Sequence, residues 1–263
     1  GNVLASKIGV YTVAGCPTAS LTFTNVPFLI LNVLNPNSSA SPSAVPAIGG
    51  GTKLVYKDCQ KANKELYKEI YSYNTITKEV EVDTITDVFL THLHFDHCGG
   101  SIEYNSDRTK LTPAFKNAKY WCNEKHWEWA VNPNPREKAS FLKDNIMPIK
   151  ESGQLQYLDT TKDFIPGFKM YEANGHTEAM MLPLLDYKGT TVAFMADLIP
   201  SVGHLPLPYV MGYDVRPLNT LKEKEYILKT AAENNWTLFF EHDPSIECCT
   251  VAQTERGIRM DKS

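Results

Sequence analysis

The sequence predicts an α/β fold, because short β-type runs alternate along the chain with amphipathic helical segments. The helical segments are residues 61–71 and 220–233. The strand runs are residues 88–90, 168–172, 191–196 and 236–241. The first helical segment gathers its apolar side chains on one face, which is typical of a helix that packs on a core: Leu66, Tyr67, Ile70 and Tyr71.

The second helical segment is expected to begin at Thr220, which forms a capping box with Glu223. Its apolar positions indicate one face packed on a sheet: Leu221, Leu228 and Ala232. The strand runs are apolar or alternate between apolar and polar residues, as strands do. We expect one α/β domain over residues 1–263, with residues 1–83 as an atypical N-terminal part.

Each strand run leads into a residue that can bind a metal. These residues are His92, His176, Asp197 and His242, in chain order. Functional sites are usually built on loops at strand ends, where a rigid sheet holds them in place. Gly175 before His176 and Gly99-Gly100 at the end of the histidine stretch provide the backbone freedom that a tight exit from a strand needs. The sequence therefore predicts that the four strand ends share one function.

Residues 91–100 read Thr-His-Leu-His-Phe-Asp-His-Cys-Gly-Gly and are the most informative stretch of the chain. Imidazole and carboxylate groups are costly to bury unless something binds them. Neutral imidazole and carboxylate are ligands for zinc and its first-row neighbours. The spacing of His92, His94, Asp96 and His97 therefore indicates a metal site.

Each motif by itself also has a purely structural interpretation. A His-x-His pair is often a solvated strand edge, and both Gly-His-Thr and His242-Asp243-Pro244 are typical of turns. Asp197 alone could cap a helix or form an ion pair. Four such motifs in this order, each following a strand, favour the metal site over these separate interpretations.

The order of the motifs resembles the metallo-β-lactamase superfamily, whose members hold one or two metals and hydrolyse esters, lactones, thioesters, amides and phosphoesters. The matching positions are the H-x-H-x-D-H stretch, Gly175-His176-Thr177, Asp197 and His242. The resemblance implies a four-layer αββα sandwich, in which two mixed β-sheets pack face to face with helices outside. It places the metals at one edge of the sheets.

The same resemblance implies a role for each ligand. His92, His94 and His176 would hold the first metal, and Asp96, His97 and His242 the second. Asp197 would bridge the two. We expect two divalent ions, with Zn²⁺ as the default and Mn²⁺, Co²⁺ or Fe²⁺ as alternatives. His94 stands where the oxygen-reducing diiron members have glutamate, which favours hydrolysis over redox chemistry.

Hydrolysis by such a site needs no serine or cysteine nucleophile. Zinc lowers the pKa of bound water to about 7, so that a hydroxide bridging the metals would attack the substrate. Asp96 or Asp197 could take up and return a proton. We interpret Cys98 as a small buried residue beside the site. His204 and Tyr209, in the Pro-rich loop after Asp197, are candidates to assist the metals, and the alternative for His204 is a surface or hydrogen-bonded loop residue.

Residues 84–258 look most like the branch that contains acyl-homoserine lactonases and methyl-parathion-hydrolase-like enzymes. Two positions depart from that branch. Gly-His-Thr is usually followed by a small residue and then glycine, but here Glu178 and Ala179 follow. Some lactonases have a tyrosine that touches the substrate where this chain has Pro200. A phosphotriester or thioester hydrolase and a non-catalytic metal-binding protein therefore stay open as alternatives.

A group of aromatic residues has two interpretations, as core or dimer contact and as the apolar wall of an acyl pocket: Trp121, His126, Trp127 and Trp129. The Asp-Thr-Gly or Asp-Asn-Gly turn that the superfamily usually has before its histidine motif is missing. Residues 47–52 are rich in glycine at that distance but contain no aspartate. This departure concerns the N-terminal part and leaves the ligand set, which lies beyond residue 90, intact.

Composition sets the remaining expectations. A net charge of −4 and the lack of a basic stripe favour a small-molecule substrate over a nucleic acid. No run approaches the roughly 20 apolar residues of a membrane span. The six cysteines form no zinc-finger pair and no CxxC motif, so we expect reduced thiols in a cytoplasmic protein, the alternative being one whose signal peptide has been removed. The lactonase-like branch also suggests a homodimer.

Overall fold

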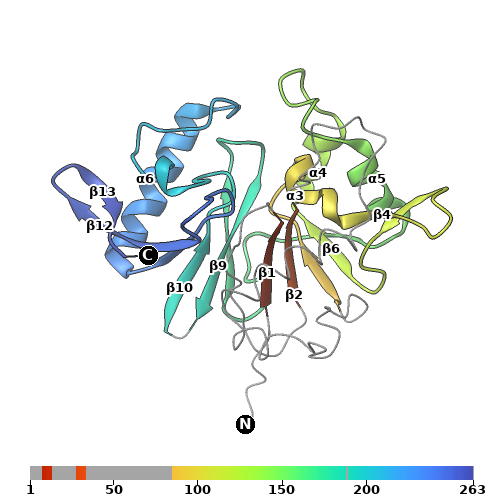
Figure 1. Ribbon diagram of the computed structural model, residues 1–263, viewed down its shortest axis with the longest axis horizontal. Coiled ribbons are helices and arrows are strands. Elements are labelled where there is room, and N and C mark those ends of the chain that lie inside the picture. Colours follow the sequence, from red (N-terminus) through yellow and green to blue (C-terminus); the bar gives the residue numbers. More distant parts are fainter. Residues whose placement is uncertain (1–7, 14–27, 34–84, 188, 263) are drawn as a thin grey trace, which may run out of the picture. The chain divides into compact units, whose positions relative to one another are not determined.

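A computed structural model describes residues 8–13, 28–33, 85–187 and 189–262 (Figure 1). The contacts divide the chain into two compact units, residues 1–122 with 138–157 and residues 123–137 with 158–263. The predicted helix at 61–71 and the glycine-rich segment 47–52 lie outside the described residues. The single-domain organisation of residues 1–263 stays a prediction.

The first unit contains a five-stranded sheet in which every described pairing is parallel. Its strands, in sheet order, are β1 (Ile8–Val13), β2 (Phe28–Val33), β3 (Asp87–Phe89), β6 (Lys119–Cys122) and β7 (Leu155–Tyr157). Val88 and Phe89 of β3 are fully buried, as expected for a parallel strand between two neighbours. The apolar run predicted as a strand at 88–90 is therefore confirmed as β3.

The described part of the first unit also contains short elements. They are α3 (Phe95–Cys98), the 3₁₀ turn η2 (Gly99–Ser101), the hairpin strands β4 (Ile102–Tyr104) and β5 (Leu111–Pro113), and α5 (Lys143–Glu151). Helix α3 follows β3 after residues 90–94, and it contacts η2 and α5. The histidine motif therefore begins at the carboxyl end of β3 and continues into α3.

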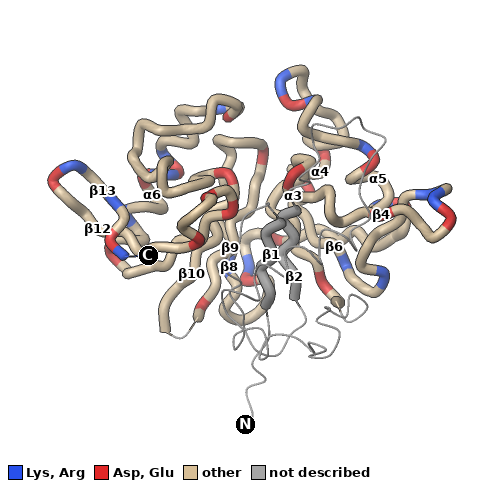
Figure 2. Tube along the Cα trace, in the orientation of Figure 1, with Lys and Arg blue, Asp and Glu red and all other residues tan. Residues whose placement is uncertain are grey.

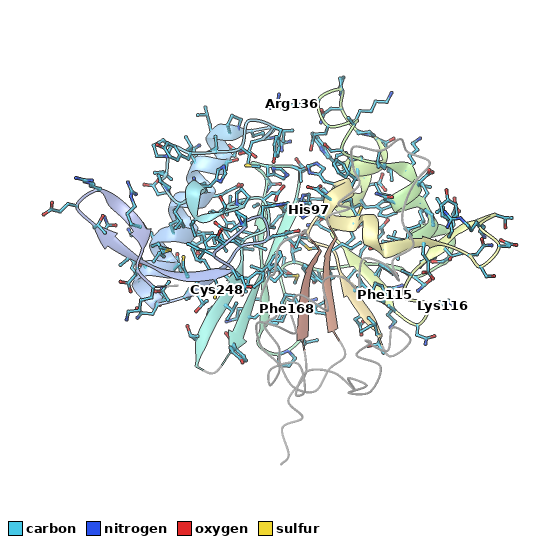
Figure 3. All side chains as sticks on the ribbon, in the orientation of Figure 1. His97, Phe115, Lys116, Arg136, Phe168 and Cys248 are labelled. Carbon is cyan, nitrogen blue, oxygen red and sulfur yellow. The ribbon has the colours of Figure 1, made fainter. Side chains whose placement is uncertain are left out.

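The second unit contains a six-stranded mixed sheet. In sheet order its strands are β13 (Gly257–Met260), β12 (Cys248–Thr254), β11 (Thr237–Phe239), β10 (Thr190–Phe194), β9 (Met180–Tyr187) and β8 (Phe168–Ala173). Strands β10 and β11 are parallel, and the other pairings are antiparallel. Phe168 of β8, labelled in Figure 3, is fully buried. All three strand runs predicted in this unit are confirmed, as β8, β10 and β11.

The topology of this sheet brings three chain segments to one edge. Phe194 of β10 lies opposite Phe239 of β11 in a parallel pair, and their rings stack at 5.5 Å. Strand β9 is antiparallel to both β8 and β10, so β8 and β10 run in the same direction. The segments that leave β8, β10 and β11 therefore emerge at the same edge of the sheet, and these are the segments that contain His176, Asp197 and His242.

Helices α4 (Glu124–Val131) and α6 (Pro217–Asn234) and the 3₁₀ turn η3 (Val202–His204) belong to the second unit, and α6 contacts β12 and β13. Helix α6 begins earlier than predicted, with Arg216 as N-cap and Pro217 at the first helical position, where proline is favoured. The predicted capping box is therefore wrong. Thr220 lies inside the helix and bonds to Asp214, and Glu223 bonds to Asn174 and Gly175.

Figure 2 shows acidic and basic positions interspersed along the described chain, for example in the turn between β12 and β13. No helix in the described part is both long enough and apolar enough to cross a membrane. The four cysteines of that part, Cys98, Cys122, Cys248 and Cys249, are free thiols.

Candidate metal centre

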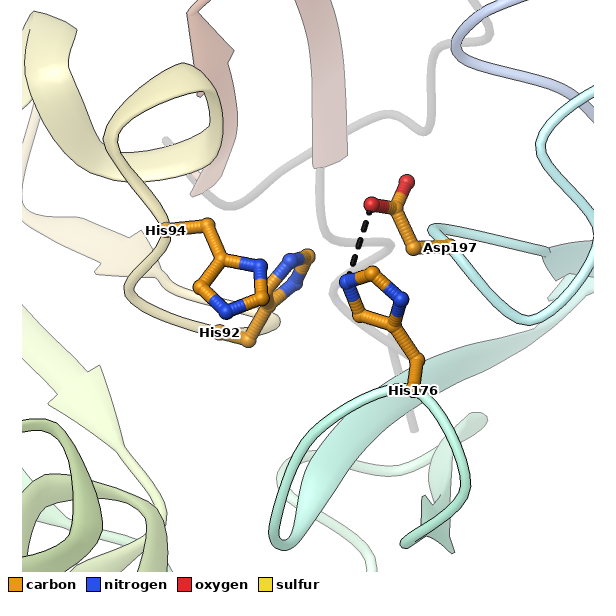
Figure 4. A group of neighbouring side chains, drawn as sticks. All are labelled: His92, His94, His176 and Asp197. Atoms are coloured by element: carbon orange, nitrogen blue, oxygen red, sulfur yellow. Dashed lines mark ion pairs between the residues drawn. The ribbon is translucent and has the colours of Figure 1, made fainter. Parts of the chain in front are cut away.

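The first unit supplies one set of candidate ligands, named here the first donor set: His92, His94, Asp96 and His97. The chain leaves β3 through Leu90, whose N–H donates to the carbonyl of Trp121 at 2.9 Å. His92 and His97 are fully buried, and their ring centroids are 3.9 Å apart. The His94 ring lies 4.7 Å from that of His92 (Figure 4). This part of the loop therefore gathers imidazoles into a small buried volume.

Local hydrogen bonds hold the rest of this set. His94 precedes α3, and its carbonyl accepts the N–H groups of His97 and Cys98. Phe95 N–H donates to Ser140 at 2.9 Å. Asp96 Oδ2 lies 3.5 Å from His97 Nε2, and the Asp96 side chain is 23% exposed. Asp96 is thus the member of the set that a substrate or solvent molecule can reach most easily.

Cys98 follows these ligands and is fully buried. Its thiol donates to the Leu93 carbonyl at 3.3 Å. Burial raises the pKa of Cys98 to about 12, so the thiol stays protonated at neutral pH. The prediction that Cys98 is a small buried residue is confirmed, and its protonated thiol agrees with the expectation that it is no nucleophile.

The second unit supplies the second donor set, defined by His176, Asp197, Glu241 and His242. His176 Nε2 lies 3.1 Å from Asp197 Oδ2, the pair marked by the dashed line in Figure 4. His242 Nε2 lies 3.0 Å from Asp197 Oδ1. Asp197 thus presents one carboxylate oxygen to each histidine, which is the arrangement that a bridging ligand would need.

The loop that carries His176 is fixed against the first turns of α6. Glu223 accepts the N–H groups of Asn174 at 2.7 Å and Gly175 at 3.0 Å. A Cβ on Gly175 would lie 2.6 Å from Thr220 Cα, so the backbones approach too closely for any side chain. Glycine at position 175 is therefore required for packing between this loop and the helix.

Two alanines beside the ligands have left-handed backbone conformations, which cost non-glycine residues energy. Ala196, directly before Asp197, has φ 41°. Ala179 has φ 50°, and its N–H donates to Asn174 Oδ1 at 2.9 Å. Position 179 is where the sequence departs from the glycine expected after Gly-His-Thr, and Ala179 keeps a glycine-like conformation without the glycine.

His176 is held from its other side by a second carboxylate. Asp214 Oδ1 lies 2.9 Å from His176 Nδ1, and Thr220 Oγ1 donates to Asp214 Oδ2 at 2.9 Å. A carboxylate on one ring nitrogen leaves the other nitrogen to serve as a ligand, which is the usual arrangement behind metal-binding histidines. Asp214 is therefore a positioning residue for His176.

The charges around His176 also favour a cation. Burial lowers the pKa of the fully buried His176 ring, but Asp197 and Asp214 outweigh burial and raise it to about 9. The carboxylates thus attract a proton to this position in the metal-free chain. A divalent metal would satisfy the same negative charge, and the imidazole and carboxylate groups are suitable ligands for one.

Thr177, the last residue of the Gly-His-Thr motif, is hydrogen-bonded to the buried acid Glu137. Its hydroxyl donates to Glu137 Oε1 at 2.6 Å, and Trp129 Nε1 donates to Glu137 Oε2 at 2.7 Å. Trp127 and His126 are fully buried, which favours the interpretation of this part of the aromatic group as core. Trp121 lies in the first unit, where its Nε1 donates to Asp87 at 2.7 Å.

The two helper candidates lie in the loop after Asp197. His204 is partly buried, and its Nδ1 lies 2.9 Å from Ser201 Oγ. Tyr209 is 59% exposed, and its backbone carbonyl accepts a hydrogen bond from Lys224. The contact with Ser201 agrees with the alternative interpretation, in which His204 is a hydrogen-bonded loop residue. An assisting role for either residue stays a prediction.

Sequence reasoning did not identify Asp214, Glu223 or Glu241 as part of the site. Asp214 and Glu223 act on a loop that lies about forty to fifty residues before them, and no local motif marks them. Glu241 directly precedes His242, so its position next to a predicted ligand could have drawn attention to it.

The family model of the metallo-beta-lactamase superfamily matches residues 71–242, well over half of the chain. The chain belongs to the metallo-β-lactamase superfamily. The matched residues contain both donor sets, and the predicted α/β fold of metallo-β-lactamase type is confirmed. The chain belongs to this superfamily and has His and Asp groups that could hold a metal ion. Both findings support the conclusion that the protein is a metal-dependent hydrolase.

Solved structures of this superfamily's fold are similar to the chain. One is a probable metal-dependent hydrolase from Staphylococcus aureus, with 22% identity over 76% of this chain and 69% of that chain, at a TM-score of 0.61. Another is AidC, a dizinc quorum-quenching lactonase in complex with a product, with 21% identity over 80% and 69% and a TM-score of 0.59. At this identity the likeness concerns the fold. No curated protein matches the chain significantly.

Proposed function

We propose that this metallo-β-lactamase superfamily member is a dinuclear metal-dependent hydrolase of lactones or related esters. The observation that carries the proposal is the complete ligand set of the superfamily, in order along the chain, with Asp197 placed between His176 and His242. In this proposal the two donor sets together bind two divalent ions, with zinc as the default. A decayed, non-catalytic relative would be expected to have lost some of these ligands.

The bound ions would supply a water of lowered pKa and polarise the substrate oxygen. The protein's own residues have the remaining tasks. Asp214 orients His176, and Glu223 fixes the loop that carries it. Asp96 is partly exposed and lies beside His97, so its carboxylate is suited to accept a proton and return it to the leaving group.

The lactone preference is supported by the lactonase-like sequence between residues 84 and 258 and by the likeness to AidC, a lactonase. The lack of a tyrosine at Pro200 means that another group would have to contact the substrate carbonyl, and we propose His204 or Tyr209 for this role. A small-molecule substrate, a homodimer and a cytoplasmic location stay predictions.

The test is hydrolysis of a long-chain acyl-homoserine lactone by zinc- or manganese-loaded protein, with metal content measured on the same sample. Turnover that disappears in His94→Ala supports the proposal. Two bound metals without turnover would reject lactones and direct the search to phosphotriesters and thioesters. Loss of activity in Asp197→Asn, with the fold retained by circular dichroism, would separate a catalytic site from a structural one.

A further inference from the structure

Glu241 is a buried acid at the edge of the second sheet where Asp197 and His242 lie. It follows β11 after Phe240, and only 1% of the residue is exposed. A carboxylate taken out of water is unfavourable unless a cation or hydrogen-bond donors compensate for the lost hydration. The surroundings of Glu241 therefore indicate what its charge binds.

Two of its neighbours are themselves candidate ligands. Asp197, Glu241 and His242 each offer a ligand atom within 4.8 Å of the others. Asp197 is also buried, at 2% exposure. Two buried carboxylates so close together repel each other unless a positive charge lies between them. His242 is 21% exposed at its side chain, which leaves a route from solvent to this group.

The acid two residues further on shows a different arrangement. Asp243 is also buried, but its carboxylate accepts the N–H groups of Val202 at 3.0 Å, Ser245 at 2.9 Å and Ile246 at 2.8 Å. These bonds join the loop after Asp197 to the loop after His242. Asp243 is therefore a structural acid that ties two loops together, and it is not a member of the Asp197, Glu241 and His242 group.

We propose that Glu241 is an additional carboxylate ligand of the metal held by Asp197 and His242, outside the seven ligands that the superfamily resemblance implies. The inference rests on the proposed metal centre but not on its substrate. A second carboxylate makes the site richer in oxygen, and oxygen ligands suit Mn²⁺ better than a histidine-rich set does. Glu241 thus raises the affinity for Mn²⁺ relative to Zn²⁺.

The experiment measures the affinities of the full chain for Mn²⁺ and Zn²⁺ by competition with a chelator, without substrate. Glu241→Gln keeps the shape and removes the charge, and Glu241→Ala removes the ligand. Asp243→Asn is the matched control, because it removes a buried negative charge nearby without removing a member of the Asp197, Glu241 and His242 group. Thermal unfolding of each metal-free variant checks that the fold survives.

In both Glu241 variants we expect the Mn²⁺ affinity to fall by more than about 100-fold, beyond the range of about 10- to 100-fold that loss of an outer-shell partner costs. The Zn²⁺ affinity should fall less, so that the ratio of the two changes, and Asp243→Asn should leave this ratio unchanged. Equal losses for both ions, no loss, or the same change of ratio in Asp243→Asn would each overturn the inference. A wild-type protein that binds metals but hydrolyses no lactone would refute the proposed substrate. The inference about Glu241 would not be affected.

Discussion

Replacing Gly175 with alanine should damage the site through packing alone. The added Cβ would lie 2.6 Å from Thr220 Cα, whereas carbon atoms pack at about 3.5–4.0 Å. The His176 loop and the start of α6 would therefore have to separate by roughly 1 Å. Overpacking of this kind costs about 1–3 kcal/mol of the free energy of unfolding.

The displacement would also reach the metal ligands. Gly175 is the neighbour of His176, and its N–H is held by Glu223. A misplacement of about 1 Å can reduce catalysis on the order of 100-fold. We therefore expect Gly175→Ala to lower the free energy of unfolding, the metal affinity and kcat/KM together.

Urea unfolding of the metal-free protein measures the first effect, and chelator competition and lactone turnover measure the others. Gly212→Ala is the matched control, because a Cβ there meets no atom within 4 Å and its backbone needs no positive φ. If Gly175→Ala unfolds at the same urea concentration as Gly212→Ala and binds metal with unchanged affinity, the close approach to Thr220 does not constrain position 175.

Three further predictions concern the same loop. Asp214→Asn should weaken metal binding about 10- to 100-fold by removing the charge behind His176, and a chelator titration with unchanged affinity would contradict this. Ala179→Gly should raise the free energy of unfolding by up to about 1 kcal/mol, because it relieves a left-handed alanine; urea unfolding showing a loss would exclude the strain. In metal-free protein, the folded pKa of His176 lies near 9, above its ordinary 6.5, so its stabilising contribution is complete below pH 6.5 and is lost as the pH rises to 9. Urea midpoints in EDTA that do not fall over this range would disprove the pairing with Asp197 and Asp214.

Local patterns in the sequence were enough to predict the strands that precede the candidate ligands. His92, His176, Asp197 and His242 each follow an apolar or alternating run, and those runs are β3, β8, β10 and β11. The pattern of apolar residues along the sequence indicates such strands, because positions buried on a sheet are occupied by apolar side chains. Cys98 was also interpreted correctly, because a small residue that follows buried ligands has few other roles.

The start of α6 shows where local patterns failed. Thr220 and Glu223 have the spacing of a capping box, but Pro217 begins the helix. Their side chains instead serve contacts with Asp214 and with the loop at Asn174. Local spacing could not distinguish a cap from these contacts, because the same oxygen atoms can bond in either way.

The sequence by itself determined which residues can bind metal, because imidazole and carboxylate chemistry belongs to each side chain wherever it lies. Tertiary structure decided what holds those side chains in place. Asp214 meets His176 across 38 residues, and Glu223 meets Asn174 across 49. Glu241 becomes a candidate ligand because the fold places its carboxylate within 4.8 Å of the ligand atoms of Asp197 and His242. Such partners arise from the pairing of distant strands and helices, and the spacing of residues along the chain does not encode them.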